Sequence, residues 1–184
     1  MFTSERAAIA ALKAQRIRPG DVMVLISCGP MGTGMEEIAQ ITTALKYLDF
    51  GKRVAVLTDA RFSGFSTGAC VGHIGPEALA GGPIGRLVDG DVVRIAIDCD
   101  QLRGSVDLVG HGEEEFGPEE GARVLAGRPM RPDLAPDAAL PEDTRLWAAL
   151  QNVGGGTWAG CVYDVDAIVA ALEAGQQALA GQQP

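Results

Sequence analysis

Two glycine-rich stretches hold most of the side chains in this sequence that could do chemistry. They are GPMGTGMEE, residues 29–37, and TDARFSGFSTG, residues 58–68. Glycine permits a close approach of the backbone to a ligand. Glu36 and Glu37 end the first stretch, where their carboxylates either reach a cation or simply favour the start of a helix. We therefore expect the functional site in these two loops.

The second stretch combines several hydroxyl groups with both signs of charge. Its polar side chains are those of Asp59, Arg61, Ser63, Ser66 and Thr67. Taken alone, this set fits either an anion-binding loop or a solvated turn. A serine without a nearby histidine lacks the usual base, so hydrolysis by a Ser–His–Asp triad is not indicated.

The cysteines and histidines give little support for a metal centre built by this chain. The four cysteines are widely spaced and form no CxxC pair, which argues against zinc or cluster ligation. We expect each of them to be a buried free thiol: Cys28, Cys70, Cys99 and Cys161. The first interpretation of both His73 and His111 is a structural one, and residues 113–115 are expected to be a solvated run of charge.

The composition is that of a globular protein. Hydrophobic residues make up 47% of the 184 residues and charged residues 21%, which suits one domain or one domain with an extension. The net charge of −9 and the lack of a basic cluster exclude nucleic acid as an expected partner. No apolar run approaches the roughly 20 residues that span a bilayer, and no signal peptide is recognisable. We expect a soluble, cytoplasmic protein with no membrane partner.

The elements around the first loop form a β–loop–α–β unit. Apolar runs predict strands at 22–26 and 54–57. Between them, apolar residues recur at helical spacing at Ile38, Ile41, Leu45 and Leu48. This spacing places Glu36 and Glu37 in the first turn of the intervening helix.

The remaining patterns predict short strands and then helices. A first helix is expected over 4–15, with Thr3 or Ser4 as its N-cap. A short helix is expected to begin near Pro76. The other expected elements are strands at 92–97 and 106–109, and helices at 118–126, 144–151 and 165–179, the last capped by Asp164. Several short strands separated by turns favour a small barrel or sandwich.

Two segments of the C-terminal third are less regular. Residues 128–141 contain four prolines and are expected to form a linker or an extended arm. The sequence GGGTW at 154–158 has two interpretations. It is either a flexible hinge anchored by Trp158 or a loop that touches the functional site or a partner subunit.

The loop sequences resemble a known family. The runs GPMGTGMEEI and TDARFSGFSTGACVGHIGPEALAGGPIGRLVDGD are similar to the C-terminal domain of the dihydroxy-acid and sugar-acid dehydratases. The tail LWAALQNVGGGTWAGCVYDVD is most similar to the xylonate dehydratase branch. The likeness extends from Phe2 to about Leu179.

The resemblance implies a fold and a division of the chain. It implies an α/β protein, a small β-barrel-like swivelling β/β/α domain of the aconitase-like kind, with flanking helices and a C-terminal helical extension. We expect the swivelling domain with the glycine-rich loops at 1–127. The proline-rich arm and the C-terminal helices are expected at 128–184. The resemblance also implies a larger, cluster-binding N-terminal domain that this chain lacks.

The resemblance further implies a hydro-lyase. The family activity is dehydration of a sugar acid, here an aldonate such as D-xylonate, to a 2-keto-3-deoxy acid. The implied cofactors are Mg²⁺ and an iron–sulfur cluster whose ligands lie in the absent N-terminal domain. That domain is thus an expected partner, without which this chain is inactive, and family members are homo-oligomers.

Catalytic and metal roles come from the same resemblance. Ser63 of RFSG matches the serine proposed as the base, and Glu37 matches the family's C-terminal magnesium ligand. Glu36 occupies the position of a proline in the family and is the weaker candidate.

Substrate-binding roles are expected for a further set of side chains. Ser66 and Thr67 would hydrogen-bond substrate hydroxyls, and His73 would contact the substrate. Arg61 would pair with the substrate carboxylate or, equally, with Asp59 as a structural clamp.

Three other interpretations of the chain remain open from sequence alone. The first is an orphaned binding or structural module that kept its fold. The second is the small subunit of a two-chain hydro-lyase. The third is the product of a truncated gene.

Overall fold

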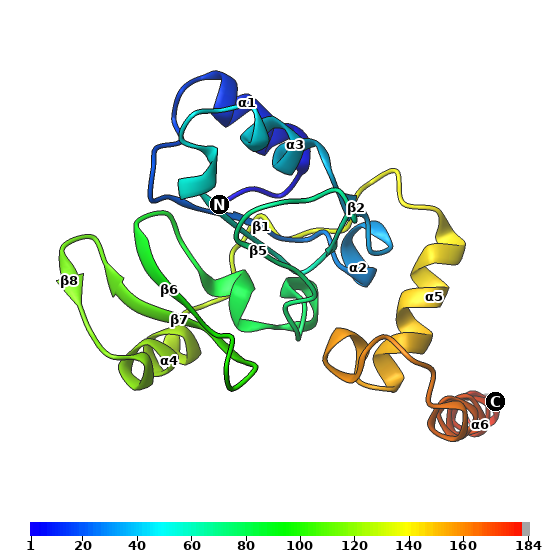
Figure 1. The fold of residues 1–184 in the computed structure, drawn as a ribbon. Coiled ribbons are helices and arrows are strands. Elements are labelled where there is room, and N and C mark those ends of the chain that lie inside the picture. The colour runs from blue at the N-terminus through cyan, green and yellow to red at the C-terminus, as the bar shows by residue number, and fades with distance from the viewer. Residues whose placement is uncertain (182–184) are drawn as a thin grey trace.

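A short parallel sheet lies at the centre of the molecule (Figure 1). The structure is a computed structural model and describes residues 1–181. The sheet contains β1 (Val22–Leu25), β3 (Ala55–Thr58) and β5 (Cys70–Val71), in the order β1-β3-β5 with all pairs parallel. Phe2 forms a further bridge to Leu25 on β1. The predicted strands at 22–26 and 54–57 are therefore confirmed.

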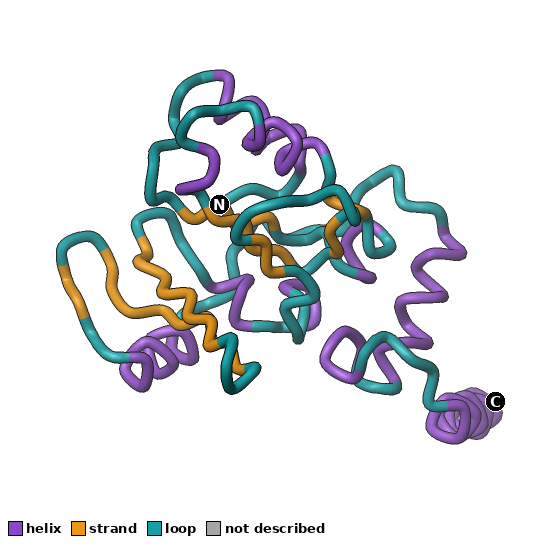
Figure 2. The backbone as a smooth tube through the Cα atoms, viewed as in Figure 1, coloured by secondary structure: helices purple, strands orange, loops and turns teal. Residues whose placement is uncertain are grey.

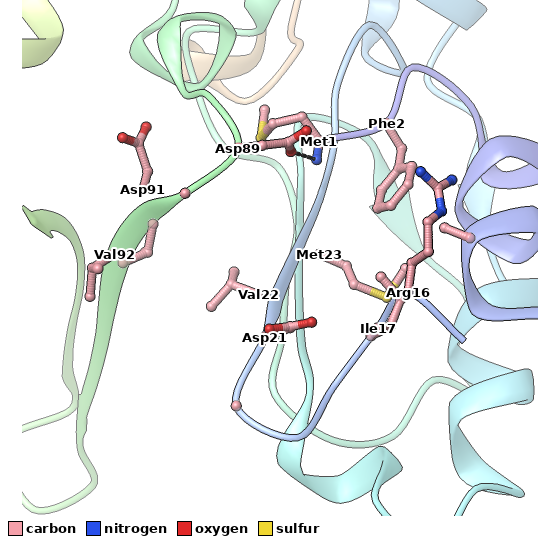
Figure 3. A pocket seen from close by; sticks show the side chains of 14 residues that line it. Met1, Phe2, Arg16, Ile17, Asp21, Val22, Met23, Asp89, Asp91 and Val92 are labelled. Carbon is pink, nitrogen blue, oxygen red and sulfur yellow. Dashed lines mark hydrogen bonds and ion pairs between the residues drawn. The ribbon is translucent and has the colours of Figure 1, made fainter. Parts of the chain in front are cut away.

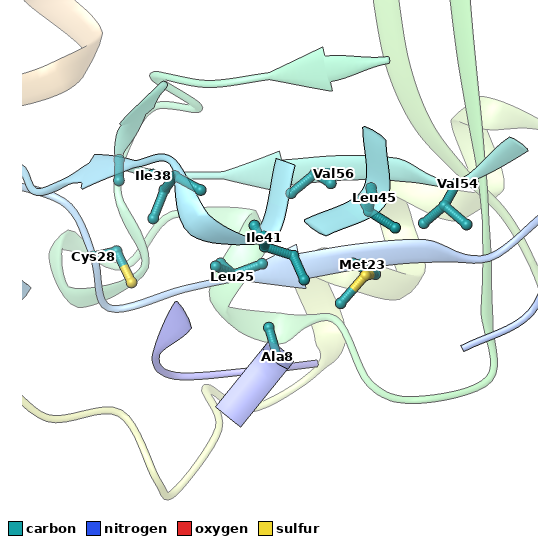
Figure 4. Packing of buried hydrophobic residues seen from close by; sticks show 10 residues of the cluster. Ala8, Met23, Leu25, Cys28, Ile38, Ile41, Leu45, Val54 and Val56 are labelled. Carbon is teal, nitrogen blue, oxygen red and sulfur yellow. The ribbon is translucent and has the colours of Figure 1, made fainter. Parts of the chain in front are cut away.

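Helices α1 (Glu5–Lys13) and α3 (Gln40–Lys46) cover one face of this sheet (Figure 4). Alternate strand residues point to opposite faces, and Met23 and Leu25 of β1 pack in the cluster under these helices. The helices contribute Ala8, Ile41 and Leu45. As predicted, α1 begins at a serine cap, where Ser4 Oγ accepts the N–H of Ala7 at 3.2 Å.

A hairpin and a helix cover the other face. The covering elements are β6 (Asp91–Asp98), β7 (Arg103–His111), β8 (Glu114–Glu115) and α4 (Pro118–Gly127), with the single-turn helices η2 (Ala78–Ala80) and η3 (Pro83–Arg86). Val24 and Leu57 of the central sheet, and Ile26 directly after β1, share a buried cluster here with Leu108 of β7. Because both faces are buried, the central strands are continuous apolar runs rather than alternating ones.

The α/β class is confirmed, but the predicted barrel is not formed. The strands of residues 1–181 make three separate sheets, β1-β3-β5, β6-β7-β8 and the pair β2 (Glu37–Ile38) with β4 (Arg61–Phe62). Closure of a barrel requires a continuous hydrogen-bonded ladder, and no ladder joins the hairpin to the parallel sheet within the described residues. The expected strands at 92–97 and 106–109 are part of the hairpin.

The C-terminal extension is helical, as predicted. It contains α5 (Glu142–Val153), the turn η4 (Gly156–Ala159) and α6 (Val165–Ala180), and Asp164 caps α6 by accepting the N–H of Ala167 at 3.0 Å. Within residues 1–181, no helix is both long enough and apolar enough to cross a membrane.

The arm over residues 128–141 has neither helix nor strand but lies against the rest of the molecule (Figure 2). Arg131 N–H donates to the carbonyl of Gly85 at 3.2 Å, and Asp137 N–H donates to the carbonyl of Gly32 at 2.8 Å. The arm therefore connects the hairpin side of the molecule with the first glycine-rich loop.

Candidate active site

The two glycine-rich loops emerge at the same edge of the central sheet. The first follows β1 and the second follows β3, while the segment 72–77 follows β5. Parallel strands place their carboxyl ends side by side, and open α/β sheets bind ligands at that edge. The fold thus brings together three segments that are far apart in sequence.

Strands β2 and β4 join the two loops directly. Glu37 is paired in register with Arg61, and Ile38 with Phe62. The N–H of Ser63 donates to the carbonyl of Ile38 at 3.0 Å. The three residues expected to provide the metal ligand, the cation and the base therefore lie on adjacent backbone segments.

The predicted location of Glu36 and Glu37 in the first turn of a helix is wrong. Residues Pro30–Thr33 form the short helix α2, Glu37 belongs to β2, and α3 begins only at Gln40. The cause is a contact from α1, because Glu5 Oε1 accepts the N–H groups of Ala39 and Ile41 at 3.0 and 2.8 Å and so caps α3.

The hydroxyl residues of the second loop differ in their surroundings. Ser66 Oγ lies 2.9 Å from Thr42 Oγ1 of α3, and its N–H donates to the carbonyl of Ser63 at 2.9 Å. Ser66 therefore anchors the loop on α3. Ser63 is half-buried, and Thr67 is exposed.

The clamp between Arg61 and Asp59 does not exist. Asp59 is completely buried, and its carboxylate accepts the N–H groups of Ser27 at 3.2 Å, Cys28 at 3.1 Å and Ala78 at 3.0 Å. Burial raises the pKa of Asp59, and the three N–H donors oppose that rise. Arg61 is exposed and makes no ion pair with any described residue.

His73 lies beside the second loop with an exposed side chain. Its backbone has a φ of +53° and its N–H donates to the carbonyl of Ala60 at 2.8 Å. His111, by contrast, has a structural role on the hairpin, where Nδ1 lies 2.9 Å from Asp91 Oδ1.

The segment 154–158 contacts the segment after β5. A Cβ atom on Gly75 would lie only 3.0 Å from the backbone nitrogen of Trp158, and Thr157 is buried. The alternative of an anchoring tryptophan is wrong, because the Trp158 side chain is 77% exposed. The backbone of η4, rather than an aromatic ring, makes this contact near the candidate site.

Glu77 is a residue that sequence reasoning missed. It was expected only as part of a short helix, yet it is 4% exposed and both its carboxylate oxygens accept the N–H of Met31 at 3.1 Å. A Cβ atom on Gly29 would collide with Glu77 Oε2, so a larger residue there would displace the Glu77 side chain. Burial and the charge of Asp59 raise the pKa of Glu77 to about 7. A glutamate among small and apolar residues, in GPEALAGG, was the available signal.

Cys28 is a buried thiol, as predicted, whereas Cys99 is exposed, contrary to expectation. Burial raises the pKa of Cys28, and the carboxylates of Glu36 and Asp59 add to the rise. Burial also raises the pKa of Glu36. The Cys28 thiol is therefore a weak nucleophile in this environment.

The side chains at this edge of the sheet offer few ligands for a metal ion. In residues 1–181, no group of three or more histidine, cysteine, aspartate or glutamate side chains is arranged to hold a metal ion. The exposed carboxylate of Glu37 has the hard oxygen donors that Mg²⁺ prefers, so it fits as one ligand of a shared site. The separated cysteines do not fit an iron–sulfur cluster.

The candidate site is open to solvent, and a cavity lies elsewhere. A cavity of about 450 Å³ lies between β1 and β6, where the N-terminal amine pairs with Asp89 Oδ1 at 2.6 Å (Figure 3). None of its lining residues belongs to the glycine-rich loops. At the candidate site, by contrast, Glu37, Arg61 and His73 are exposed.

In this chain, polar side chains lie on glycine-rich loops at the carboxyl edge of a parallel sheet, which is where open α/β domains bind ligands. The sequence model of the family described as dihydroxy-acid/6-phosphogluconate dehydratase C-terminal matches residues 1–122. The chain belongs to this family, and its relatives are dehydratases.

Individual relatives agree with this assignment. The chain is 57% identical to the D-xylonate dehydratase YagF of Escherichia coli K12 over 179 residues, which are 97% of this chain and 27% of the relative. It is 56% identical to the D-xylonate dehydratase YjhG of the same strain over 174 residues, 94% of this chain and 27% of the relative. A dihydroxy-acid dehydratase of Leifsonia xyli is 49% identical over 108 residues, 58% of this chain and 19% of the relative.

The chain spans about a quarter of the length of the D-xylonate dehydratases it matches. Those matches extend over the arm and the C-terminal helices, whereas the family model ends at residue 122. The C-terminal extension is thus a feature that this chain shares with the D-xylonate dehydratases.

Proposed function

We propose that this chain is the C-terminal part of a hydro-lyase that dehydrates a sugar acid, an aldonate such as D-xylonate, to a 2-keto-3-deoxy acid. The observation that carries the proposal is the β2–β4 pairing, which sets Glu37 opposite Arg61 with Ser63 two residues further on. The identity of 57% to a D-xylonate dehydratase supports the substrate class.

Dehydration of a 2,3-dihydroxy acid removes the proton on C2 and expels the hydroxyl on C3. Ser63 is the proposed acceptor of the C2 proton. An alkoxide forms on a serine only near positive charge. The exposed Arg61 is the proposed partner of the substrate carboxylate, since it makes no ion pair within the described residues.

Other proposed contacts fix the rest of the substrate. Thr67 and His73 are exposed beside the second loop and can bond sugar hydroxyls. Ser66 can do so only while it keeps its bond to Thr42 Oγ1, because one hydroxyl offers one donor and two acceptor positions.

Two cofactors belong to the proposal. Glu37 would hold Mg²⁺ together with ligands from outside this chain, and the bound ion would stabilise negative charge on the substrate carboxylate. The iron–sulfur cluster does not fit the cysteines of this chain, so we assign its ligands to the N-terminal portion that the longer relatives have.

The same reasoning makes this chain a half-site. Residues 1–127 form the proposed swivelling domain and 128–184 the arm and helices, and the N-terminal portion supplies the facing wall. A one-sided, solvent-open surface excludes too little water for this chemistry. We therefore expect no dehydration by this chain alone.

A reconstitution assay tests the proposal. This chain, alone and then mixed anaerobically with the N-terminal portion of a D-xylonate dehydratase loaded with iron–sulfur and Mg²⁺, is assayed for 2-keto-3-deoxy acid formation from D-xylonate. Activity only in the mixture is the expected result. A folded chain that binds the N-terminal portion but gives no product would instead indicate an orphaned module. Equal turnover of branched dihydroxy acids would contradict the sugar-acid assignment.

A further inference from the structure

The buried carboxylate of Glu77, which is not part of the first glycine-rich loop, holds that loop by hydrogen bonds. Glu77 lies on the segment after β5, and it accepts the Met31 N–H with both oxygens. The close approach of Gly29 to Glu77 Oε2 leaves no room for a side chain at that position. The next residue, Ala78, donates its N–H to the buried Asp59. Two neighbouring carboxylates therefore tie this segment to the loops after β1 and β3.

Hydrogen bonds connect Gly29 to the later residues of the loop. Its carbonyl accepts the N–H groups of Gly32, Thr33 and Met35, at 3.1, 3.0 and 3.1 Å. Thr33 Oγ1 donates to the carbonyl of Cys28 at 2.8 Å and accepts the N–H of Glu36 at 3.1 Å. A displacement of Gly29 thus moves the whole turn up to Glu36.

The path ends at the candidate active site. The carbonyl of Glu36 accepts the N–H of Arg61 at 3.4 Å, and the next residue, Glu37, is paired with Arg61. Every step from Glu77 to Glu37 is a hydrogen bond or a covalent connection along one short turn. The path uses none of the side chains that we assign to substrate or metal.

We propose that Glu77 is a positioning residue of the candidate active site, which holds the 29–34 turn and thereby fixes strand β2 with Glu37. The geometric part of this inference stands on the hydrogen bonds alone. Its catalytic part rests on the proposed function.

The charge on Glu77 makes the arrangement sensitive to pH. Burial and the charge of Asp59 raise its pKa to about 7, and the Met31 N–H opposes this rise. A carboxylate is a stronger acceptor for an N–H group than a carboxylic acid. The bond to Met31 is therefore stronger above pH 7 than below it, and Asp59 is the charged group that faces Glu77 from the loop after β3.

The first test follows backbone amides of this chain by NMR from pH 5 to pH 9. We expect the Met31 amide resonance to move with a midpoint near 7, and the Glu37 amide to move with the same midpoint. The Ala7 amide, which bonds to Ser4 Oγ, serves as a control that does not share this midpoint. In Glu77→Gln, both movements should disappear. A Glu37 amide that does not move with the same midpoint as the Met31 amide would overturn the inference, whatever the value of that midpoint.

The wild-type titration needs no variant, so it decides the question even if Glu77→Gln does not fold. Catalysis gives a second readout in the reconstituted mixture. Glu77→Gln should lower kcat by roughly ten- to a hundredfold, as expected for a group that orients a metal ligand, and should remove an inflection near pH 7 from the pH profile. Unchanged kcat and pH profile would contradict the catalytic part. A wild-type mixture without activity but with the NMR titration would defeat the proposed function and leave the positioning role intact.

Discussion

At the scale of single residues, two buried carboxylates hold the loops of the candidate site. Asp59 and Glu77 are both buried and both accept backbone N–H groups. Such groups fix loops because an unsatisfied buried carboxylate is costly. Their substitution should therefore change both stability and its dependence on pH.

The raised pKa of Glu77 predicts the direction in which the stability of the chain changes with pH. Its pKa is about 7 in the folded chain and 4.5 ordinarily, so its stabilising contribution is fully present below pH 4.5 and is lost as pH rises through 7. The free energy of unfolding of wild type, relative to Glu77→Gln, should fall between pH 5 and pH 8 by at most about 3 kcal/mol. Urea denaturation at fixed pH values measures this difference. A difference in unfolding free energy that is constant with pH would show that the pKa of Glu77 is not raised in the folded chain.

Two glycines of the site loops offer a matched pair. A Cβ atom on Gly32 would lie 2.0 Å from the carbonyl oxygen of Ser27, whereas one on Gly64 meets nothing within 4 Å. Gly32→Ala should lower the free energy of unfolding by about 1–3 kcal/mol because backbone must move. Gly64→Ala should leave it within about 0.5 kcal/mol. Equal effects in urea denaturation would contradict the close packing of the first loop.

At the scale of elements, the arm and α5 support the site, while α6 does not. Asp137 N–H donates to the carbonyl of Gly32, and Thr144 Cγ2 of α5 lies 2.5 Å from the position that a Cβ atom on Gly34 would take. The α6 helix has no buried residue. The extension therefore contains one part that positions the first loop and one part that is dispensable for it.

Two truncated chains test the different roles of the arm with α5 and of α6. A chain ending at Tyr163 should keep its Tm within about 3 °C, because little burial is lost. A chain ending at Arg128 should lose at least about 5 °C, since several buried contacts disappear, and amide exchange at Gly32 should become faster. Calorimetry and hydrogen exchange measure the two effects. An equally large loss of Tm in both chains would argue against the support role of the arm.

The elements also show what local sequence could and could not predict. The helices α1, α4, α5 and α6 and the central strands follow from periodicity and capping residues such as Ser4 and Asp164. The start of α3 did not, because its cap is Glu5, 34 residues before Ala39. The prediction of a barrel was wrong for a related reason, since the local alternation of apolar and polar residues does not encode which distant strands pair.

The candidate site also combines features that local sequence predicts with features that it does not predict. The glycine-rich loops with Glu37, Arg61 and Ser63 could be picked out from sequence because their residue types and motif are local features, and the structure brings these three residues onto paired segments. Their roles stay predictions. The anchoring roles of Asp59 and Glu77 could not be picked out, because each depends on backbone groups brought from other loops. The clamp assigned to Asp59 and Arg61 rested on sequence proximity, which burial overrode.

At the scale of the whole molecule, two observations fit the proposal that this chain is a half-site: the candidate site is open to solvent, and the chain matches only part of its relatives' length. The chain covers 27% of each D-xylonate dehydratase, and Glu37, Arg61 and His73 of its candidate site are exposed. The facing wall, the other magnesium ligands and the cluster ligands are proposed to come from the N-terminal portion. Assembly as a homo-oligomer remains a prediction for the complete enzyme.

The measurement that tests the central claim most directly is the dehydration of D-xylonate by the reconstituted mixture with Ser63→Ala. Ser105→Ala, on the hairpin strand β7, is the matched control. A base contributes typically a hundred- to ten-thousandfold, so we predict that Ser63→Ala lowers kcat by about a thousandfold and Ser105→Ala leaves it unchanged, with both variants folded by circular dichroism. A folded Ser63→Ala variant with kcat within a few-fold of wild type would contradict the assignment of this loop as the catalytic part of the chain.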